Sequence, residues 1–328
     1  MSFNSSLLLI IVAGLMNGSF VIPTKYAQGF SNEKIWFYHS IIGLTLIPSL
    51  ILILLFPETI KNYLSLQPKF LLFLIFSGVI FGLGQVFFAY AIEAIGVALS
   101  FTINLSIGVT IGSIFVLFDN DLFFTSQGYL ATLAAFFILG SLIIYYFSFK
   151  NKKSNFYKLG LYYHKGWLLA CLTGLTSGLQ NITFIIVAFH AIVQSQSNNS
   201  FWVWPPFLLA AAIPMFFGFL YRMKKSSRVT FPHPTIVKPL IIKNMSLIAL
   251  MGMCFTGSLA LYSSGMSQLD HQQQIVGWPA FMIAIILTCQ TWGWFYKEYR
   301  SIATKNKFGL LCSVLLLAIA MIILAFGR

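Results

Sequence analysis

The chain has 328 residues, of which 58% are hydrophobic and only 8% are charged, and its net charge is +13. A soluble globular domain carries about 25% charged residues, so the composition excludes an ordinary water-soluble fold. The basic residues lie in short segments between apolar runs, where such charge sets membrane topology, so we expect no binding of nucleic acid. The four cysteines have neither metal-ligand nor disulfide spacing, and we expect no metal and no cofactor.

Ten apolar runs are each long enough to cross a bilayer, which takes about 20 residues. They cover 5–24, 34–56, 70–92, 96–118, 128–148, 166–190, 200–221, 244–266, 274–296 and 307–326. Because a backbone in lipid must satisfy its own hydrogen bonds, each run is expected to be a helix. The stretch from Phe70 to Phe149 contains no Lys or Arg, which is typical of consecutive membrane spans.

The distribution of positive charge predicts the orientation of these spans. With ten spans, 17 of the 20 basic residues fall on one face of the membrane. Basic residues favour the cytoplasmic side, so both termini are predicted to be periplasmic in a bacterial inner membrane. The first basic residue, Lys25, follows the first apolar run, so we expect no cleavable signal peptide.

A short repeat relates the first and the sixth span. Gly14-Leu15-Met16-Asn17-Gly18 matches Gly174-Leu175-Thr176-Ser177-Gly178 in register, five spans apart. Two copies that are offset by an odd number of spans have opposite orientations in the membrane, and inverted repeats are typical of secondary transporters. Small residues at this spacing also occur in helix packing generally. The repeat predicts an all-α membrane protein with two inverted five-helix halves, 1–149 and 166–328, joined by a basic cytoplasmic linker at 150–165.

Several short motifs resemble the bacterial L-rhamnose–proton symporter family. The similarity covers most of the chain, and its motifs are short and largely glycines. The motifs are Phe20-Val21-Ile22-Pro23-Thr24-Lys25 with Ser31, Glu33 and Trp36; Gly78, Gly82, Gly84 and Gln85; Ile95-Gly96; Gly108 and Gly112; Tyr262-Ser263-Ser264-Gly265; and Lys297-Glu298-Tyr299.

This resemblance implies membership of the drug/metabolite transporter superfamily, with ten helices and sugar uptake driven by protons. Two positions depart from the pattern that it leads us to expect, since Gln85 and Phe88 stand in place of Asn and Tyr. The segment 268–273 also looks different. These departures concern positions near a possible ligand, so the particular sugar stays open.

A sugar carrier replaces the water around several hydroxyl groups, and side-chain amides both donate and accept hydrogen bonds. The predicted substrate-binding residues are Asn17, Gln85, Asn104, Gln180, Asn181 and Tyr262. Gln180 and Asn181 are adjacent and point about 100° apart on a helix, so we favour Asn181. The alternative is that these amides join packed helices, and Gln85 shares a stripe with Gly78, Gly82 and Ala89 that looks like a close-packed seam.

Proton coupling requires a group that titrates, and the candidates are Glu93, His39 and Glu33. Glu93 ends the third span in an apolar turn, where partial burial would favour protonation. The alternatives are that Glu93 lies at the interface beside a helix N-terminus, that Glu33 caps a helix, and that His39 is a packing residue. Asp270 and His271 are expected in an outer loop.

Other classes of function lack their motifs in this chain. It contains no His-Glu-x-x-His, no Gly-x-Ser-x-Gly and no paired intramembrane aspartates, so we expect no enzyme. An exporter of metabolites or amphipathic drugs on the same fold stays an alternative to sugar uptake. Trp202, Trp204 and Trp278 flank outer ends of spans and are expected in the aromatic belt.

Overall fold

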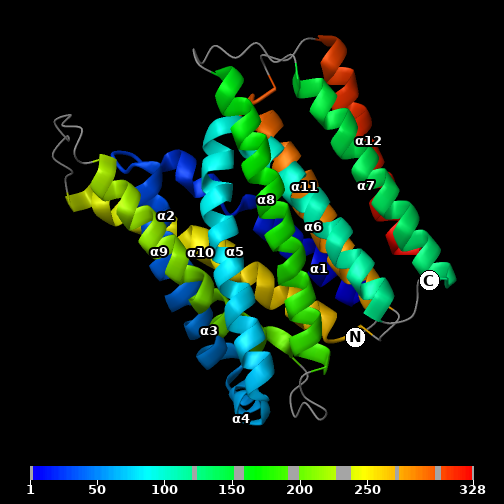
Figure 1. Ribbon diagram of the computed structural model, residues 1–328, viewed down its shortest axis with the longest axis horizontal. Coiled ribbons are helices and arrows are strands. Elements are labelled where there is room, and N and C mark those ends of the chain that lie inside the picture. The colour runs from blue at the N-terminus through cyan, green and yellow to red at the C-terminus, as the bar shows by residue number, and fades with distance from the viewer. Residues whose placement is uncertain are drawn as a thin grey trace.

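The computed structural model describes residues 3–119, 124–150, 159–190, 199–226, 238–269, 273–299 and 304–326. All regular structure within these ranges is helical (Figure 1). The α-helices are α1 (Phe3–Ser19), α2 (Asn32–Ile41), α3 (Ile47–Leu55), α4 (Asn62–Ser65), α5 (Pro68–Ile95), α6 (Val97–Asp119), α7 (Ser126–Lys150), α8 (Leu159–Ile185), α9 (Trp204–Ser226), α10 (Lys238–Met266), α11 (Gln274–Phe295) and α12 (Thr304–Phe326). Shorter helical turns are η1 (Ile22–Tyr26), η2 (Ile42–Leu46), η3 (Pro57–Lys61), η4 (Ile186–His190) and η5 (Ser200–Val203).

Nine helical segments in the described residues are long and apolar enough to cross a membrane, which confirms the first nine predicted spans. The tenth predicted span, 307–326, coincides with α12, but the apolar helix identified there runs only over Asn306–Ala320. Ten crossings therefore stay a prediction. Half of the predicted basic linker, residues 151–158, lies outside the described residues, as do Asp270 and His271.

The second span is interrupted by a π-helical turn, η2, between α2 and α3. Pro48 follows this turn and has no N–H for the regular helical bond to the Leu44 carbonyl, which accounts for the irregular geometry. The hydroxyl of Thr256 on α10 donates to the Gly43 carbonyl at 3.0 Å. The break thus offers a backbone acceptor to the neighbouring helix.

Six helices form the centre of the bundle: α1, α5, α6, α8, α10 and α11. α1 packs against α10 and α11, α8 packs against α5 and α6, and α6 also contacts α11. α2 and α9 pack together on one side, while α7 and α12 lie side by side at the opposite edge (Figure 1). The residues that could meet a substrate are therefore expected on the six central helices.

The predicted seam on α5 is confirmed as a close helix contact. A Cβ at Gly78 would lie 2.9 Å from the Cβ of Ala210, and a Cβ at Gly82 would overlap the Ala211 carbonyl oxygen on α9. The small residues therefore let the backbones of α5 and α9 approach closely, as small residues do in membrane bundles.

Three tryptophans contradict their predicted place in the aromatic belt. Trp202, Trp204 and Trp278 are at most 1% exposed. The Trp204 indole donates to Ser263 Oγ at 2.7 Å, and its ring stacks on Phe184 with 5.0 Å between ring centres. The apolar surface around these residues belongs to the protein core and not to the bilayer interface.

Candidate functional site

Three buried polar side chains lie where α6, α8, α10 and α11 approach one another. Asn181 and Tyr262 are 0% exposed and Trp278 is 1% exposed. Among the described residues, neither the amide nitrogen nor the amide oxygen of Asn181 has a hydrogen-bond partner. The Tyr262 hydroxyl and the Trp278 indole N–H also lack one. Since buried polar groups in native proteins are nearly always paired, this cluster requires an explanation.

Gly112 on α6 brings two of these groups together. A Cβ at this position would stand 2.7 Å from Asn181 Nδ2 and 2.7 Å from Trp278 Nε1. Both nitrogen atoms therefore face the same small patch of α6 backbone. A larger residue at position 112 would occupy the space on which the amide and the indole converge.

Aromatic rings surround the polar atoms of this cluster. The Tyr262 ring lies 5.8 Å from Trp278 at 71° and 4.7 Å from Phe281 at 29°, and it is 5.4 Å from Phe184. Aromatic faces cover the C–H face of a sugar, while an amide, a phenol and an indole N–H bond its hydroxyl groups. We call Asn181, Tyr262 and Trp278 the buried polar cluster.

Asn17 and Asn104, two further predicted binding residues, join helices. Asn17 Nδ2 donates to Ser258 Oγ at 2.8 Å, which links α1 to α10. Ser177 Oγ donates to Asn104 Oδ1 at 2.7 Å, which links α8 to α6. Both asparagines are buried. This geometry fits the alternative that they stabilise helix packing.

The two glutamines are buried as well, at 7% exposure for Gln85 and 6% for Gln180. Gln85 lies on α5 beyond the glycines of the seam with α9, and Gln180 lies on α8 directly before Asn181. Their part in substrate binding stays a prediction. Of the six predicted residues, Asn181 and Tyr262 belong to the buried polar cluster.

The three predicted coupling residues differ in their surroundings. Glu93 is exposed and accepts a hydrogen bond from Asn32 Nδ2 at 3.2 Å, which argues against partial burial and fits the alternative that it lies at the interface. Glu33 is half-buried in the first turn of α2. His39 is 2% exposed, and its Nδ1 has no hydrogen-bond partner in the described part of the chain.

His39 lies in an aromatic enclosure beside the π-helical turn. Its ring is 6.1 Å from Phe20, 5.7 Å from Trp36 and 6.2 Å from Phe255. These contacts come from the end of α1, from α2 itself and from α10. A change in the His39 side chain would therefore act on three elements at once.

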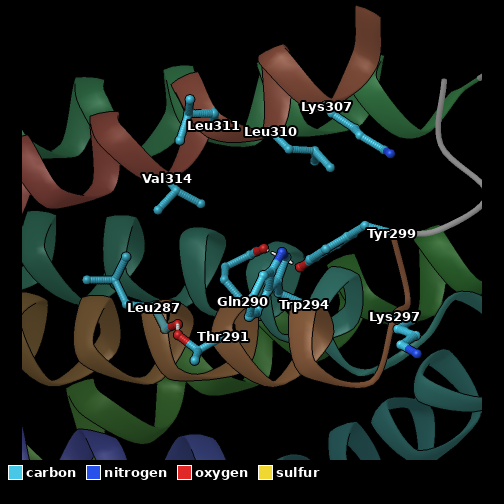
Figure 2. Close-up of a pocket in the computed structure, with 10 residues that line it drawn as sticks. All are labelled: Leu287, Gln290, Thr291, Trp294, Lys297, Tyr299, Lys307, Leu310, Leu311 and Val314. Carbon is cyan, nitrogen blue, oxygen red and sulfur yellow. Dashed lines mark hydrogen bonds between the residues drawn. The ribbon is translucent and has the colours of Figure 1, made fainter. Parts of the chain in front are cut away.

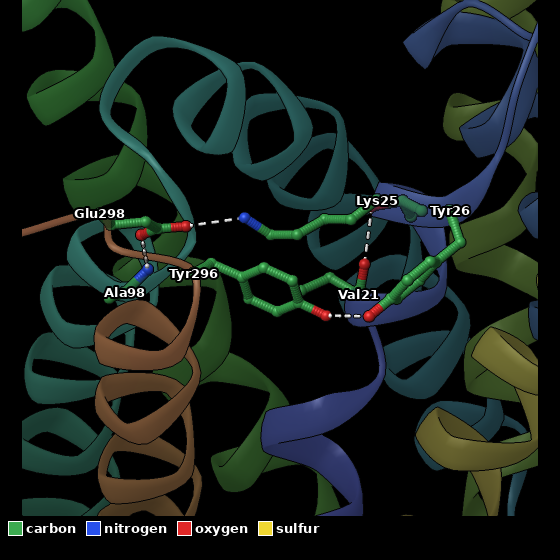
Figure 3. A network of polar contacts seen from close by, with 7 residues as sticks. Val21, Lys25, Tyr26, Ala98, Tyr296 and Glu298 are labelled. Atoms are coloured by element: carbon green, nitrogen blue, oxygen red, sulfur yellow. Dashed lines mark hydrogen bonds and ion pairs between the residues drawn. The ribbon is translucent and has the colours of Figure 1, made fainter.

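An ion pair ties together the ends of α1 and α11. Lys25 Nζ lies 3.0 Å from Glu298 Oε1, and the Ala98 N–H at the start of α6 donates to Glu298 Oε2 at 3.2 Å (Figure 3). Lys25 also lies over the Tyr296 ring, 4.4 Å from its centre, and the hydroxyls of Tyr26 and Tyr296 are 2.8 Å apart. We call this set of contacts the Lys25–Glu298 closure.

The turn that supplies Glu298 has an unusual backbone. Lys297 has a φ of +58°, and the Glu298 N–H donates to the Gly293 carbonyl at 2.9 Å, so α11 ends in a Schellman motif. Glycine usually takes the left-handed position, where another residue costs about 1–2 kcal/mol. Such strain at a non-glycine residue is common at functional sites.

A second polar network lies directly behind this turn. The Gln290 amide oxygen accepts hydrogen bonds from the Tyr145 hydroxyl, at 3.1 Å, and from the Tyr299 hydroxyl. Gln290 Nε2 donates to Thr102 Oγ1 at 2.6 Å. Burial raises the pKa of Tyr299 well above its usual value, so this phenol stays a neutral donor. The network fixes the segment after α11 against α6 and α7.

A family model described as L-rhamnose-proton symport protein (RhaT) matches residues 4–328. The chain belongs to this family. Its similar curated proteins include the L-rhamnose-proton symporters of Yersinia pestis (strain Pestoides F) and Yersinia pseudotuberculosis serotype O:3 (strain YPIII). The chain is 22% identical to each over 325 residues, which cover 94% of this chain and 94% of each relative. The protein is thus a transporter of the symporter class and not an enzyme.

Two features of this RhaT-family transporter were not predicted as functional from the sequence. Trp278 carried a usable signal, because it precedes Pro279 inside an apolar run, but that position also fits an interface residue. For the Lys25–Glu298 closure, the sequence gives no signal beyond the family motifs, since its two charged residues are separated by most of the chain. Only the packing of α1 against α11 brings them together.

Proposed function

We propose that this RhaT-family transporter takes up a sugar together with protons, and that Asn181, Tyr262 and Trp278 bind the sugar. The observation that carries the proposal is the set of buried, unpaired polar atoms on α8, α10 and α11. An unpaired buried amide costs about 1–3 kcal/mol, and a ligand with several hydroxyl groups would recover that cost. Rhamnose is the first candidate, because the similar curated proteins carry its name.

The remaining predicted residues have supporting parts in this proposal. Gln85 and Gln180 are buried amides near the same central helices, and we propose that they complete the sugar site. We propose that Asn17 and Asn104 hold the helices around it through their bonds to Ser258 and Ser177.

Uptake into proteoliposomes tests the substrate. With a proton gradient, labelled rhamnose should accumulate above its outside concentration, and unlabelled rhamnose should exchange with it when no gradient is applied. Related sugars that lack one hydroxyl group should compete less well. Efflux of aromatic cations with no exchange of any sugar would contradict the proposal and favour the exporter.

We propose His39 as the proton-coupling group, with Glu93 and Glu33 as its competitors. His39 is buried among aromatic rings beside the π-helical turn, and π-helical turns inside helices occur frequently at functional sites. An imidazole in water changes its charge near neutral pH. Because His39 is buried among aromatic rings, it would take up a proton only when this enclosure opens to water. Glu93 and Glu33 lie nearer the surface, where protons exchange with solvent.

We predict that His39→Gln abolishes proton-driven accumulation and leaves rhamnose exchange intact, because exchange needs no net proton transfer. Glu93→Gln and Glu33→Gln, measured in the same vesicles, serve as matched controls. If Glu93→Gln alone loses uphill uptake, coupling resides in that carboxylate and the assignment of His39 is wrong.

We also propose the finer architecture. In two inverted five-helix halves, α1 would correspond to α8, α5 to α10 and α6 to α11. The packing supports this arrangement, because α1 contacts α10 and α11 just as α8 contacts α5 and α6. The repeated glycines agree with this. A Cβ at Gly14 or Gly18 would collide with α11, and a Cβ at Gly174 or Gly178 would collide with α6.

The same proposal includes the surrounding membrane. α12 would be the tenth crossing. In Figure 1, α1 begins and α12 ends toward the same lower end of the bundle, which supports an even number of crossings. We propose a bacterial inner membrane, periplasmic termini and membership of the drug/metabolite transporter superfamily. Labelling of a cysteine placed after Phe3, from each side of oriented vesicles, tests the position of the N-terminus.

A further inference from the structure

A pocket of about 800 Å³ opens between α11 and α12, away from the buried polar cluster. Its walls are apolar, with Leu287 and Trp294 on α11 and Leu311 and Val314 on α12 (Figure 2). Trp294 is 75% exposed and Leu311 is 55% exposed. In a membrane protein such apolar surface faces lipid, so the pocket is open to the bilayer.

The polar floor of this pocket is already satisfied. Gln290 uses its amide oxygen for Tyr145 and Tyr299 and its amide nitrogen for Thr102. A sugar would find few free donors or acceptors there, in contrast to the buried polar cluster. The shape and chemistry of the pocket therefore suit a different kind of ligand.

Two cations stand at one end of the pocket. Lys297 and Lys307 lie toward the same end in Figure 2, while Leu287 and Val314 lie toward the other. Both lysines are exposed, and neither has an ion-pair partner within the described residues. The nearby carboxylate of Glu298 pairs with Lys25 instead. The backbone of Lys297 is in the left-handed region, a conformation that glycine usually adopts at the end of a helix. The pocket thus combines a basic end with an apolar channel.

We propose that this pocket binds an anionic phospholipid of the adjacent membrane leaflet, with its phosphate on Lys297 and Lys307 and an acyl chain along Leu287, Leu311 and Val314. Basic pockets between membrane helices attract anionic headgroups, and the apolar wall accepts the chain. Glu298 follows Lys297 in the same turn. A bound lipid would therefore also hold the turn that supplies Glu298 to the Lys25–Glu298 closure.

The test measures lipid binding by the intact protein in detergent, by native mass spectrometry with phosphatidylglycerol. The test variant combines Lys297→Gly with Lys307→Gln, because glycine fits the backbone at position 297. Each lysine near an anionic headgroup contributes about fivefold in affinity, so the double variant should bind phosphatidylglycerol at least tenfold more weakly. Lys224→Gln with Lys225→Gln on α9, an equally basic exposed pair outside the pocket, should bind as the wild type does.

Three ligands separate the contribution of the lipid headgroup from that of the acyl chain. Phosphatidylglycerol should raise the thermal midpoint of the wild type but not of the pocket variant, and phosphatidylcholine should raise neither. Glycerol 3-phosphate, which has no acyl chain, should not compete. Equal loss in the α9 control, equal stabilisation by phosphatidylcholine, or full competition by glycerol 3-phosphate would each overturn the proposal. The thermal midpoint of the variant without added lipid shows that it is folded.

Discussion

Two asparagines on neighbouring helices show how the partners of a buried amide separate packing from binding. Asn104 accepts a hydrogen bond from Ser177, whereas Asn181, one helical turn beyond Ser177, has no partner among the described residues. Removing a paired amide leaves its partner unsatisfied, but removing an unpaired one relieves a cost. The two residues should therefore respond oppositely to the same kind of substitution.

We predict that Asn181→Leu raises the thermal midpoint of the empty protein, because an unpaired buried amide costs about 1–3 kcal/mol. The same substitution should lower sugar uptake more than tenfold. Thermal unfolding in detergent and uptake into proteoliposomes measure the two effects. Asn104→Leu is the matched control and should lower the midpoint, since it leaves the Ser177 hydroxyl unpaired. A lower midpoint for Asn181→Leu would mean that this amide has a structural partner.

At the scale of helices, the apolar pattern of the sequence predicts nine of the spans in the described residues, because length and hydropathy decide what crosses a bilayer. The glycine stripe on α5 predicts its close contact, because only small residues let two backbones meet there. Which helix lies opposite could not be predicted. Gly78 and Gly82 face α9, more than a hundred residues later in the chain, and no local pattern identifies that partner.

The candidate site, like the helix packing, could be predicted only in part from the sequence. Asn181 follows from the rarity of polar groups inside apolar spans, and Tyr262 lies in one of the motifs that resemble the family. Trp278 does not, because an aromatic residue near the end of a span fits both the interface and the core. The exposure of Glu93 also could not be read from its apolar neighbours, since Asn32 comes to it from the start of another helix.

The contact between α5 and α9 gives a prediction about elements. Gly82→Ala should destabilise the protein by about 1–3 kcal/mol, because the new methyl group would overlap the Ala211 carbonyl oxygen. Gly140→Ala on α7 is the control, since its methyl group would meet only Leu316 Cδ1 at 3.8 Å. That variant should be neutral or more stable by up to about 1 kcal/mol through helix propensity. Thermal midpoints in detergent compare the two, and equal midpoints would mean that α5 and α9 separate without cost.

At the scale of the whole molecule, a symporter alternates between states open to either side, and the contacts at each end set their populations. The Lys25–Glu298 closure joins α1, α6 and α11 at one end of the bundle. The carboxylate of Glu298 also lies at the N-terminus of α6, where the helix dipole favours negative charge. Loss of Glu298 therefore removes the ion pair and the contact with α6, and loss of Lys25 removes the ion pair and the contact with the Tyr296 ring.

We predict that Lys25→Gln and Glu298→Gln both raise the population open at this end, because each removes the ion pair. The two side chains are 29% and 17% exposed, so the pair contributes about 1 kcal/mol or less, which is a shift of up to roughly fivefold.

The labelling rate of Ser100→Cys by an impermeant thiol reagent measures that population, in a background without the four native cysteines. Ser100 is 0% exposed and lies close to Ala98 on α6, so it reacts only when this end opens. Ser113→Cys, buried in the other half of α6, should label no faster in either variant. Faster labelling at both positions would indicate general loosening of the bundle, and unchanged labelling at Ser100→Cys would mean that the ion pair does not close this end.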